Sequence, residues 1–170
     1  MLSTLPSELG VDKARRRWRR GGGIAAVLFA AVVVVAAFNL LGVKTSTATS
    51  RLSDGTTVEV RYGLITRPGL ATPWTVTVHR PGGFDAPITI RTDSSYLAMF
   101  DENGLDPDPA SATSDRDDVI WEFDPPPGDT LVVTFDARIE PGVQWGEDGR
   151  TVVDLGDVQG EVAYHTWVLP

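Results

Sequence analysis

The sequence contains no cysteine and only two histidines, His79 and His165. Without cysteine there is no disulfide, thiol nucleophile, iron–sulfur cluster or cysteine-ligated zinc site. Two separate histidines are too few for a histidine-based zinc site, which usually takes three or four protein ligands. The nucleophile-elbow, P-loop, dinucleotide-binding and H-E-x-x-H patterns are missing as well. We therefore expect a protein that is not an enzyme, with no catalytic residue and no bound cofactor.

Charge is missing from one long segment near the N-terminus. No charged residue occurs between Gly21 and Val43, and a helix of this length would span roughly 34 Å. A bilayer core of about 30 Å needs about 20 apolar residues. The centre of the segment, Ile24–Phe38, contains only Ile, Ala, Val, Leu and Phe. A helix on a soluble protein would need a polar face, so the segment predicts a transmembrane helix.

The residues that flank this segment predict its orientation. Six basic residues and Trp18 precede it, and Lys44 alone follows it closely. Basic residues stay on the cytoplasmic side, and Trp favours the headgroup level. We expect residues 1–20 to be a short basic cytoplasmic tail, 21–43 a single-pass signal-anchor in the plasma membrane, and 44–170 an extracytoplasmic domain. A cleaved signal peptide stays open as the alternative, with a weak cleavage site at Ser46–Ala48.

The charge is distributed unevenly along the chain. Residues 1–42 carry six basic and two acidic residues, whereas residues 43–170 carry nine basic and 21 acidic residues, a net charge of −12. An acidic external part repels nucleic acid and anionic lipid, so we expect no nucleic-acid partner. The simplest role of this negative charge is to keep the domain soluble. The alternative is that it binds a basic partner or a cation.

No external stretch shows helical periodicity over three turns, and short segments alternate apolar with polar residues instead. This period of two is typical of half-buried antiparallel strands. The segments are Thr45–Leu52, Thr56–Tyr62, Pro73–Arg80, Pro87–Thr92, Asp118–Asp124, Thr130–Glu140, Arg150–Leu155 and Gly160–Leu169. Ser53–Gly55 predicts a tight hairpin between the first two. In the last segment both alternating sets are largely apolar, which indicates a strand covered on both faces or a partner surface.

Seven or eight short strands in about 125 residues predict an all-β fold, an antiparallel β-sandwich. The strand spacing, Trp74 in PWTVTV and the segment PPPGDTLVVTF resemble bacterial immunoglobulin-like or fibronectin-like domains, over roughly Thr45–Leu169. The cysteine pair of antibody domains is absent. The whole chain resembles actinobacterial single-pass membrane proteins of unassigned function. The resemblance implies an Ig-like β-sandwich after one N-terminal transmembrane α-helix, and it transfers no functional residue.

The segment Phe100–Asp118 is long, acidic and without a regular pattern. Long irregular loops in compact domains are often functional, and calcium prefers the hard oxygen ligands found here. The calcium candidates are Asp101, Glu102, Asn103, Asp106 and Asp108. Their order does not match the EF-hand loop. A calcium site, a partner-binding loop and a solvated loop over a sheet edge stay open as alternatives.

Three aromatic residues are candidate contacts for a partner: Trp145 in a Gly-rich loop, Trp167 in the last segment, and Tyr96. Exposed Trp side chains are frequent anchors of protein interfaces. We expect a membrane-anchored interaction domain, either an accessory subunit of an integral membrane complex or an envelope module that binds protein. The alternative is a module that binds a cell-wall ligand, namely carbohydrate or calcium.

Overall fold

The computed structural model describes residues 23–34 and 42–170. Residues 23–34 form an α-helix from the centre of the apolar segment. Within these two ranges, no helix is long and apolar enough to cross a membrane. The expected cytoplasmic tail, residues 1–20, and both ends of the expected signal-anchor, residues 21–22 and 35–41, lie outside the described residues. The chain divides into two units, and the second, Val43–Pro170, is the β-domain.

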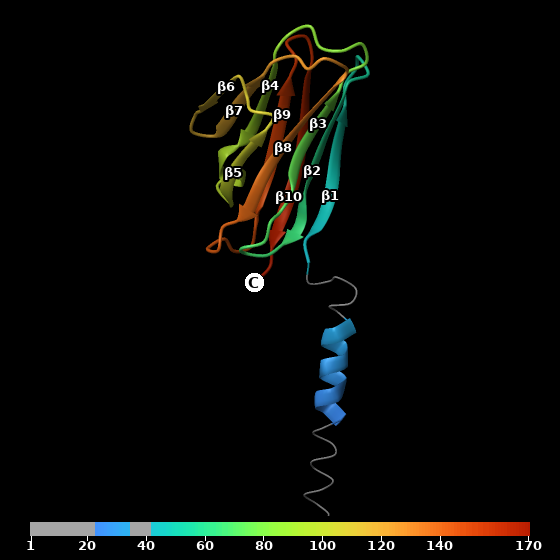
Figure 1. Ribbon diagram of the computed structural model, residues 1–170, viewed down its shortest axis with the longest axis vertical. Helices are drawn as coiled ribbons and strands as arrows, with labels where there is room; N and C mark the ends of the chain where they lie inside the picture. Colours follow the sequence, from blue (N-terminus) through green and yellow to red (C-terminus); the bar gives the residue numbers. More distant parts are fainter. Residues whose placement is uncertain (1–22, 35–41) are drawn as a thin grey trace, which may run out of the picture. The chain divides into compact units, whose positions relative to one another are not determined.

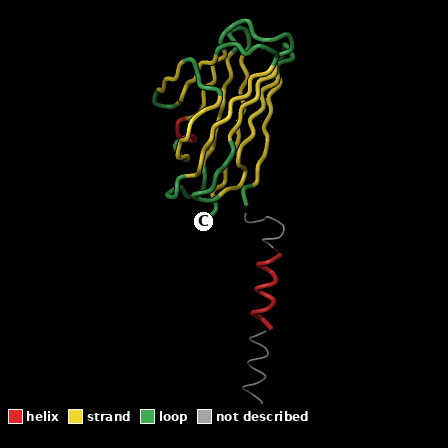
Figure 2. The backbone as a smooth tube through the Cα atoms, viewed as in Figure 1, coloured by secondary structure: helices red, strands yellow, loops and turns green. Residues whose placement is uncertain are grey.

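The β-domain consists almost entirely of strands (Figures 1 and 2). They are β1 (Lys44–Arg51), β2 (Thr57–Thr66), β3 (Trp74–His79), β4 (Ile88–Asp93), β5 (Phe100–Asp106), β6 (Ser111–Ser114), β7 (Asp118–Phe123), β8 (Thr130–Ile139), β9 (Glu147–Asp154) and β10 (Gln159–Val168). A four-residue helix, α2 (Ser94–Leu97), follows β4. The strands form one sheet in the order β5-β8-β3-β2-β10-β9-β4-β7-β6, and β1 pairs with β2. The prediction of an all-β domain is confirmed.

The described part of the chain holds ten strands, so the prediction of seven or eight was too low. The two additional strands, β5 and β6, lie in the segment Phe100–Asp118 that we expected to be irregular. β5 pairs with β8 across a bulge between Glu102 and Leu105, and every β6 side chain is exposed. A bulge breaks the period of two, and a fully exposed strand has no apolar face. Neither strand therefore shows the alternation that reveals strands in a sequence.

The two halves of the sheet meet where β2 and β10 run parallel, with Trp167 opposite Ile65 and Val168 opposite Thr66. The sheet curls, and its two halves enclose the core between them (Figure 1). The strand pairs on either side of this junction are antiparallel. β10 alternates buried and exposed side chains along its length. Of the two alternatives for this strand, coverage of both faces is wrong, because the outer face of β10 is accessible, and a partner surface stays a prediction.

Aromatic side chains from both halves fill the core. Trp74 on β3 is fully buried, and its ring centroid lies 6.0 Å from that of Trp121 on β7. The Trp74 Nε1–H donates to the hydroxyl of Tyr164 on β10 at 2.9 Å. The Tyr164 hydroxyl shares a second hydrogen bond, of 2.8 Å, with Thr151 on β9. Burial raises the pKa of Tyr164 to about 12, so this hydroxyl stays neutral and links the two halves of the sheet.

Two carboxylates near the β1–β2 hairpin make stability depend on pH. Asp54 accepts hydrogen bonds from the backbone N–H and the hydroxyl of Thr56, which hold the pKa of Asp54 below its ordinary value of 3.8. Asp157 accepts two hydrogen bonds from the Arg80 guanidinium, at 3.2 and 2.7 Å, which lower the pKa of Asp157. Both pKa values are lower in the folded state than in the unfolded state. The stability that these hydrogen bonds contribute is therefore present above about pH 4 and is lost as the pH falls through the folded-state pKa values.

We expect the double variant Asp54→Asn, Asp157→Asn to lose less stability than the wild type between about pH 7 and about pH 3, because neutral amides take up no proton. Urea midpoints at the two pH values measure the difference. Asp136→Asn, which changes an exposed acid on β8, is the matched control and keeps the wild-type pH dependence. An unchanged pH dependence in the double variant would contradict the role of these carboxylates.

Candidate interaction surface

Three strand ends meet where the chain enters the β-domain. β1 begins at Lys44, which lies opposite Ile65 on β2. Ile65 also lies opposite Trp167 on β10, and the Leu169 N–H donates to the Thr66 carbonyl at 3.0 Å. Figure 1 shows the C-terminus at this end, near the start of β1. We call this end of the sheet the entry end.

The loop between β8 and β9 presents Trp145 at the entry end. Its backbone is attached at both sides: the Glu140 N–H donates to the Met99 carbonyl at 2.8 Å, and the Val168 N–H donates to the Trp145 carbonyl at 3.5 Å. Trp145 has a φ of 73°, a left-handed conformation that costs about 1–2 kcal/mol for a residue with a Cβ. The Trp145 side chain is nevertheless 75% exposed. Burial of the indole in the domain therefore does not offset this cost.

Exposed apolar side chains gather at the entry end. Among the described residues of the β-domain, five large apolar side chains are exposed. One of them, Val132, lies on the outer face of β8. Leu70 belongs to the turn after β2, where its carbonyl accepts the Ile139 N–H at 3.0 Å, next to the start of the Trp145 loop. The four residues at the entry end, which we call the entry-end surface, are Leu70, Trp145, Trp167 and Leu169.

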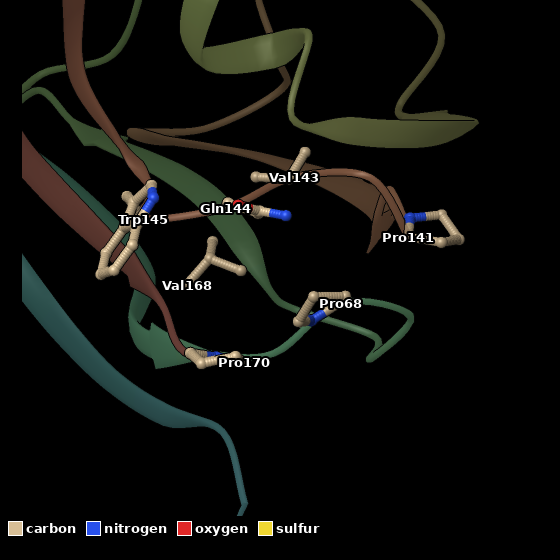
Figure 3. Close-up of a pocket in the computed structure, with 7 residues that line it drawn as sticks. All are labelled: Pro68, Pro141, Val143, Gln144, Trp145, Val168 and Pro170. Atoms are coloured by element: carbon tan, nitrogen blue, oxygen red, sulfur yellow. The ribbon is translucent and has the colours of Figure 1, made fainter.

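A pocket of about 210 Å³ opens beside Trp145 (Figure 3). Its lining is mainly apolar: Pro68, Pro141, Val143, Gln144, Trp145, Val168 and Pro170. Figure 3 shows Pro68 and Pro170 along one side and the loop residues Val143 and Gln144 along the other. The lining residues include no nucleophile, acid or base. The pocket can receive an apolar group, and the Gln144 amide and the Trp145 N–H are its polar side-chain groups.

The ring of Trp167 is supported by His165, two residues before it on the same face of β10. The two ring centroids lie 4.4 Å apart, at an interplanar angle of 63°. The Nδ1 atom of His165 lies 2.7 Å from a carboxylate oxygen of Asp148, which fixes the orientation of the imidazole. The imidazole thus packs against the indole, and 52% of Trp167 remains exposed. His165 therefore positions Trp167 in the entry-end surface.

The three aromatic candidates differ in their exposure to solvent. Trp145 and Trp167 are exposed, and the pairing of Glu147 with Thr166 brings them to the same end. Tyr96 is fully buried, so its assignment as an exposed contact is wrong. Its hydroxyl is 2.9 Å from the Thr166 hydroxyl, and its ring packs edge-on against Tyr164. The turn of α2 directs Tyr96 into the core, and a four-residue helix is too short to be detected from periodicity.

The calcium candidates lie along β5 and the turn after it. Asp101 pairs with Arg138, and Asp106 pairs with Thr134, both on β8. Asp108 is exposed in the following turn, and the side chains of Glu102 and Asn103 lie outside the described residues. Successive side chains of a strand point to opposite faces. In the part of the chain that the structure describes, no group of three or more His, Cys, Asp or Glu is placed to hold a metal ion.

Sequence reasoning missed Leu70 and Leu169 as members of this surface. The turn signal Arg67–Gly69 precedes Leu70, but a single Leu after a turn does not indicate exposure. Leu169 continues the alternation of its strand. Alternation shows which residues share a face of the strand, but it does not show which face is exposed. The pairing of β10 with β2 and β9 places Leu169, and the hydrogen bond from the Ile139 N–H places Leu70. The surface depends on three segments that are distant in sequence.

Replacing Trp145 with Ala is expected to change the free energy of unfolding by no more than about 0.5 kcal/mol, the usual range for surface substitutions. The side chain is mostly exposed, and Ala keeps the same backbone constraint at positive φ. Urea denaturation of the full chain in mild detergent, followed by near-ultraviolet circular dichroism, measures the change. A loss of several kcal/mol would place the indole in the core instead.

The entry-end surface and its pocket offer aromatic and aliphatic contacts, with positive and negative side chains nearby. No protein-family model and no curated protein matches the chain.

Proposed function

We propose that the chain is a non-enzymatic, membrane-anchored interaction domain on the extracytoplasmic side of the plasma membrane. The observation that carries the proposal is the position at which β1 begins. β1 begins at Lys44, directly after the charge-free segment that ends at Val43. A domain attached in this way stays at the bilayer surface and meets proteins that lie in or next to the same membrane.

The fold that we propose for the domain is an Ig-like β-sandwich. The two halves of the curled sheet support it, because each half places apolar side chains on an inner face. Trp74 from one half contacts Trp121 from the other. Sandwiches of this kind hold ligands or partners through loops and edges and are used for many unrelated functions. The fold therefore suits an interaction domain and does not by itself name the partner.

The partner that we propose is an integral membrane protein, for which this chain is an accessory subunit, or else an envelope protein close to the membrane. The strongly acidic domain repels other acidic surfaces and favours a partner with basic side chains. Long flexible linkers allow a domain to search a large volume, and no such linker lies between Val43 and β1. A partner within the same membrane requires none.

Co-purification tests the partner. A tag on the N-terminus, light cross-linking and extraction of the full chain in mild detergent should recover an integral membrane protein in stoichiometric amount. A cross-linked product with the mass of a single chain, in cells that express the protein at its natural level, would contradict the role as a subunit.

The absence of cysteine gives a clean test of the topology. A single Cys at Val132→Cys, on the exposed face of β8, should react with a membrane-impermeant maleimide on intact cells. A single Cys at Ser3→Cys should react only after the membrane is permeabilised. The natural sequence contributes no background signal, because it has no thiol. The reverse labelling pattern would overturn the proposed orientation.

A further inference from the structure

The strand register fixes the distance between the entry-end surface and the point where the chain enters the domain. Lys44 on β1, Ile65 on β2 and Trp167 on β10 are successive partners across two ladders. Neighbouring strands lie about 4.8 Å apart, so the backbones of Lys44 and Trp167 are within about 10 Å of each other. Lys44 and Trp167 therefore lie close together at the same end of the sheet.

Lys44 is also the first residue after the proposed anchor. The headgroup region of a bilayer adds about 5–8 Å on each side of a hydrocarbon core of about 30 Å. If Val43 ends the membrane-spanning segment, Lys44 lies in this region. The two ladder steps place Trp167 at the same end of the domain as Lys44, together with Leu169 and the Trp145 loop, whose carbonyl accepts the Val168 N–H.

We propose that the entry-end surface is a lipid-docking surface, and that Trp145 and Trp167 insert into the headgroup layer of the same bilayer that holds the anchor. This inference rests on the proposed function, because it requires the anchor. An indole has an apolar body and one N–H donor, and Trp is enriched at the membrane–water interface for this reason. Leu70 and Leu169 add aliphatic contact on either side of the two rings.

The charges around this surface favour zwitterionic headgroups over strongly anionic ones. Lys44 and Arg67 stand at the entry end, but so do Glu140, Glu147 and Asp148. The domain as a whole is acidic, which disfavours an anionic surface. Docking therefore depends on aromatic and aliphatic contacts rather than on charge. We expect it to persist at high salt, because screening weakens only the electrostatic part.

The geometry of Trp145 fits lipid docking. Trp145 is held in a left-handed conformation and is the most exposed large apolar residue of the β-domain among those described. Strained residues of this kind are kept where they serve a function. The Trp167 ring is held by packing against the His165 ring. Trp167 is presented by β10, and Trp145 by a loop whose backbone is hydrogen-bonded to β10, so little conformational entropy is lost when the two rings enter the headgroup layer.

Quenching by brominated lipid tests the proposal on the full chain. The protein is reconstituted into phosphatidylcholine vesicles without any other protein, in a Trp18→Phe background that removes the tryptophan outside the β-domain. Bromine atoms near the headgroups should quench Trp emission more strongly than bromine atoms deep in the bilayer. Two of the four remaining tryptophans belong to the surface, so up to about half of the emission is quenched.

The double variant Trp145→Phe, Trp167→Phe should lose this quenching. Trp121→Phe, which changes a buried tryptophan on β7, is the matched control and should keep it.

Absence of quenching in vesicles that retain the protein after an alkaline wash would overturn lipid docking and leave the anchor intact. Release of the protein by the wash would instead overturn the anchor. A photo-cross-linker at position 145 that captures a protein in native membranes, with no quenching in pure lipid, would assign the surface to a protein partner and overturn the lipid proposal.

Discussion

The variant Trp74→Ala is expected to lower the free energy of unfolding by about 3–5 kcal/mol, the usual cost of truncating a fully buried Trp. Trp74 has no exposed surface and contacts aromatic rings from both halves of the sheet. Its ring centroid is 6.0 Å from that of Trp121 and 6.2 Å from that of Phe135. The substitution leaves a cavity between the halves, which rigid strands fill only in part. It also removes the hydrogen bond to Tyr164.

Urea unfolding of the full chain in mild detergent measures this loss, and two further variants divide it into parts. Tyr164→Phe keeps the packing but leaves the Trp74 N–H buried without an acceptor, so we expect it to cost about 1–3 kcal/mol. Val132→Ala truncates an apolar side chain on the outer face of β8 and should cost about 0.5 kcal/mol or less. A Trp74→Ala variant as stable as Val132→Ala would refute the core between the two halves of the sheet.

The second large effect is expected at Gly146, immediately after Trp145. A Cβ at this position would collide with the Thr166 carbonyl oxygen and would lie 3.0 Å from the Trp167 Cα. Gly146 also has a φ of 94°, which a residue with a Cβ rarely adopts. We expect Gly146→Ala to cost about 3 kcal/mol or more, because backbone atoms of β10 have to move. The exposure of the indoles at Trp145 and Trp167 should change as well.

Gly142→Ala in the same loop is the matched control, because a Cβ there meets no atom within 4 Å. It should leave stability within about 0.5 kcal/mol of the wild type. Trp emission and its quenching by acrylamide report whether the loop has moved. If Gly146→Ala were as stable as Gly142→Ala, with unchanged emission, the loop would not pack against β10 as described.

The all-β class was predictable because a strand that buries one face alternates apolar and polar residues along the sequence. β3 and β8 show it throughout, with every second side chain buried. The hairpin at Ser53–Gly55 was predictable from its turn residues, and the structure closes it with the Leu52 N–H donating to the Thr56 carbonyl at 2.8 Å. Gly55 supplies the positive φ, 89°, that this turn requires.

The strands β5 and β6 were not predictable, because edge strands of this kind bury little and carry no alternation. The entry-end surface was only half predictable. Trp145 and Trp167 attract attention as residue types, but their proximity depends on the register of β9 with β10. Register is a long-range property that alternation alone does not fix. The burial of Tyr96 on α2 was not predictable for a related reason, because it depends on packing against Tyr164 of β10.

The position of β1 has a mechanical consequence. Lys44 is at once the attachment point of the proposed anchor and the first residue of an eight-pair antiparallel ladder with β2. β1 runs away from the entry end, so a pull on Lys44 directed along the strand acts at right angles to the hydrogen bonds of the ladder. Force in this direction loads the whole ladder in shear, and the pairs resist it together instead of opening one after another. A pull along β1 is therefore resisted in the direction in which a β-ladder is hardest to tear.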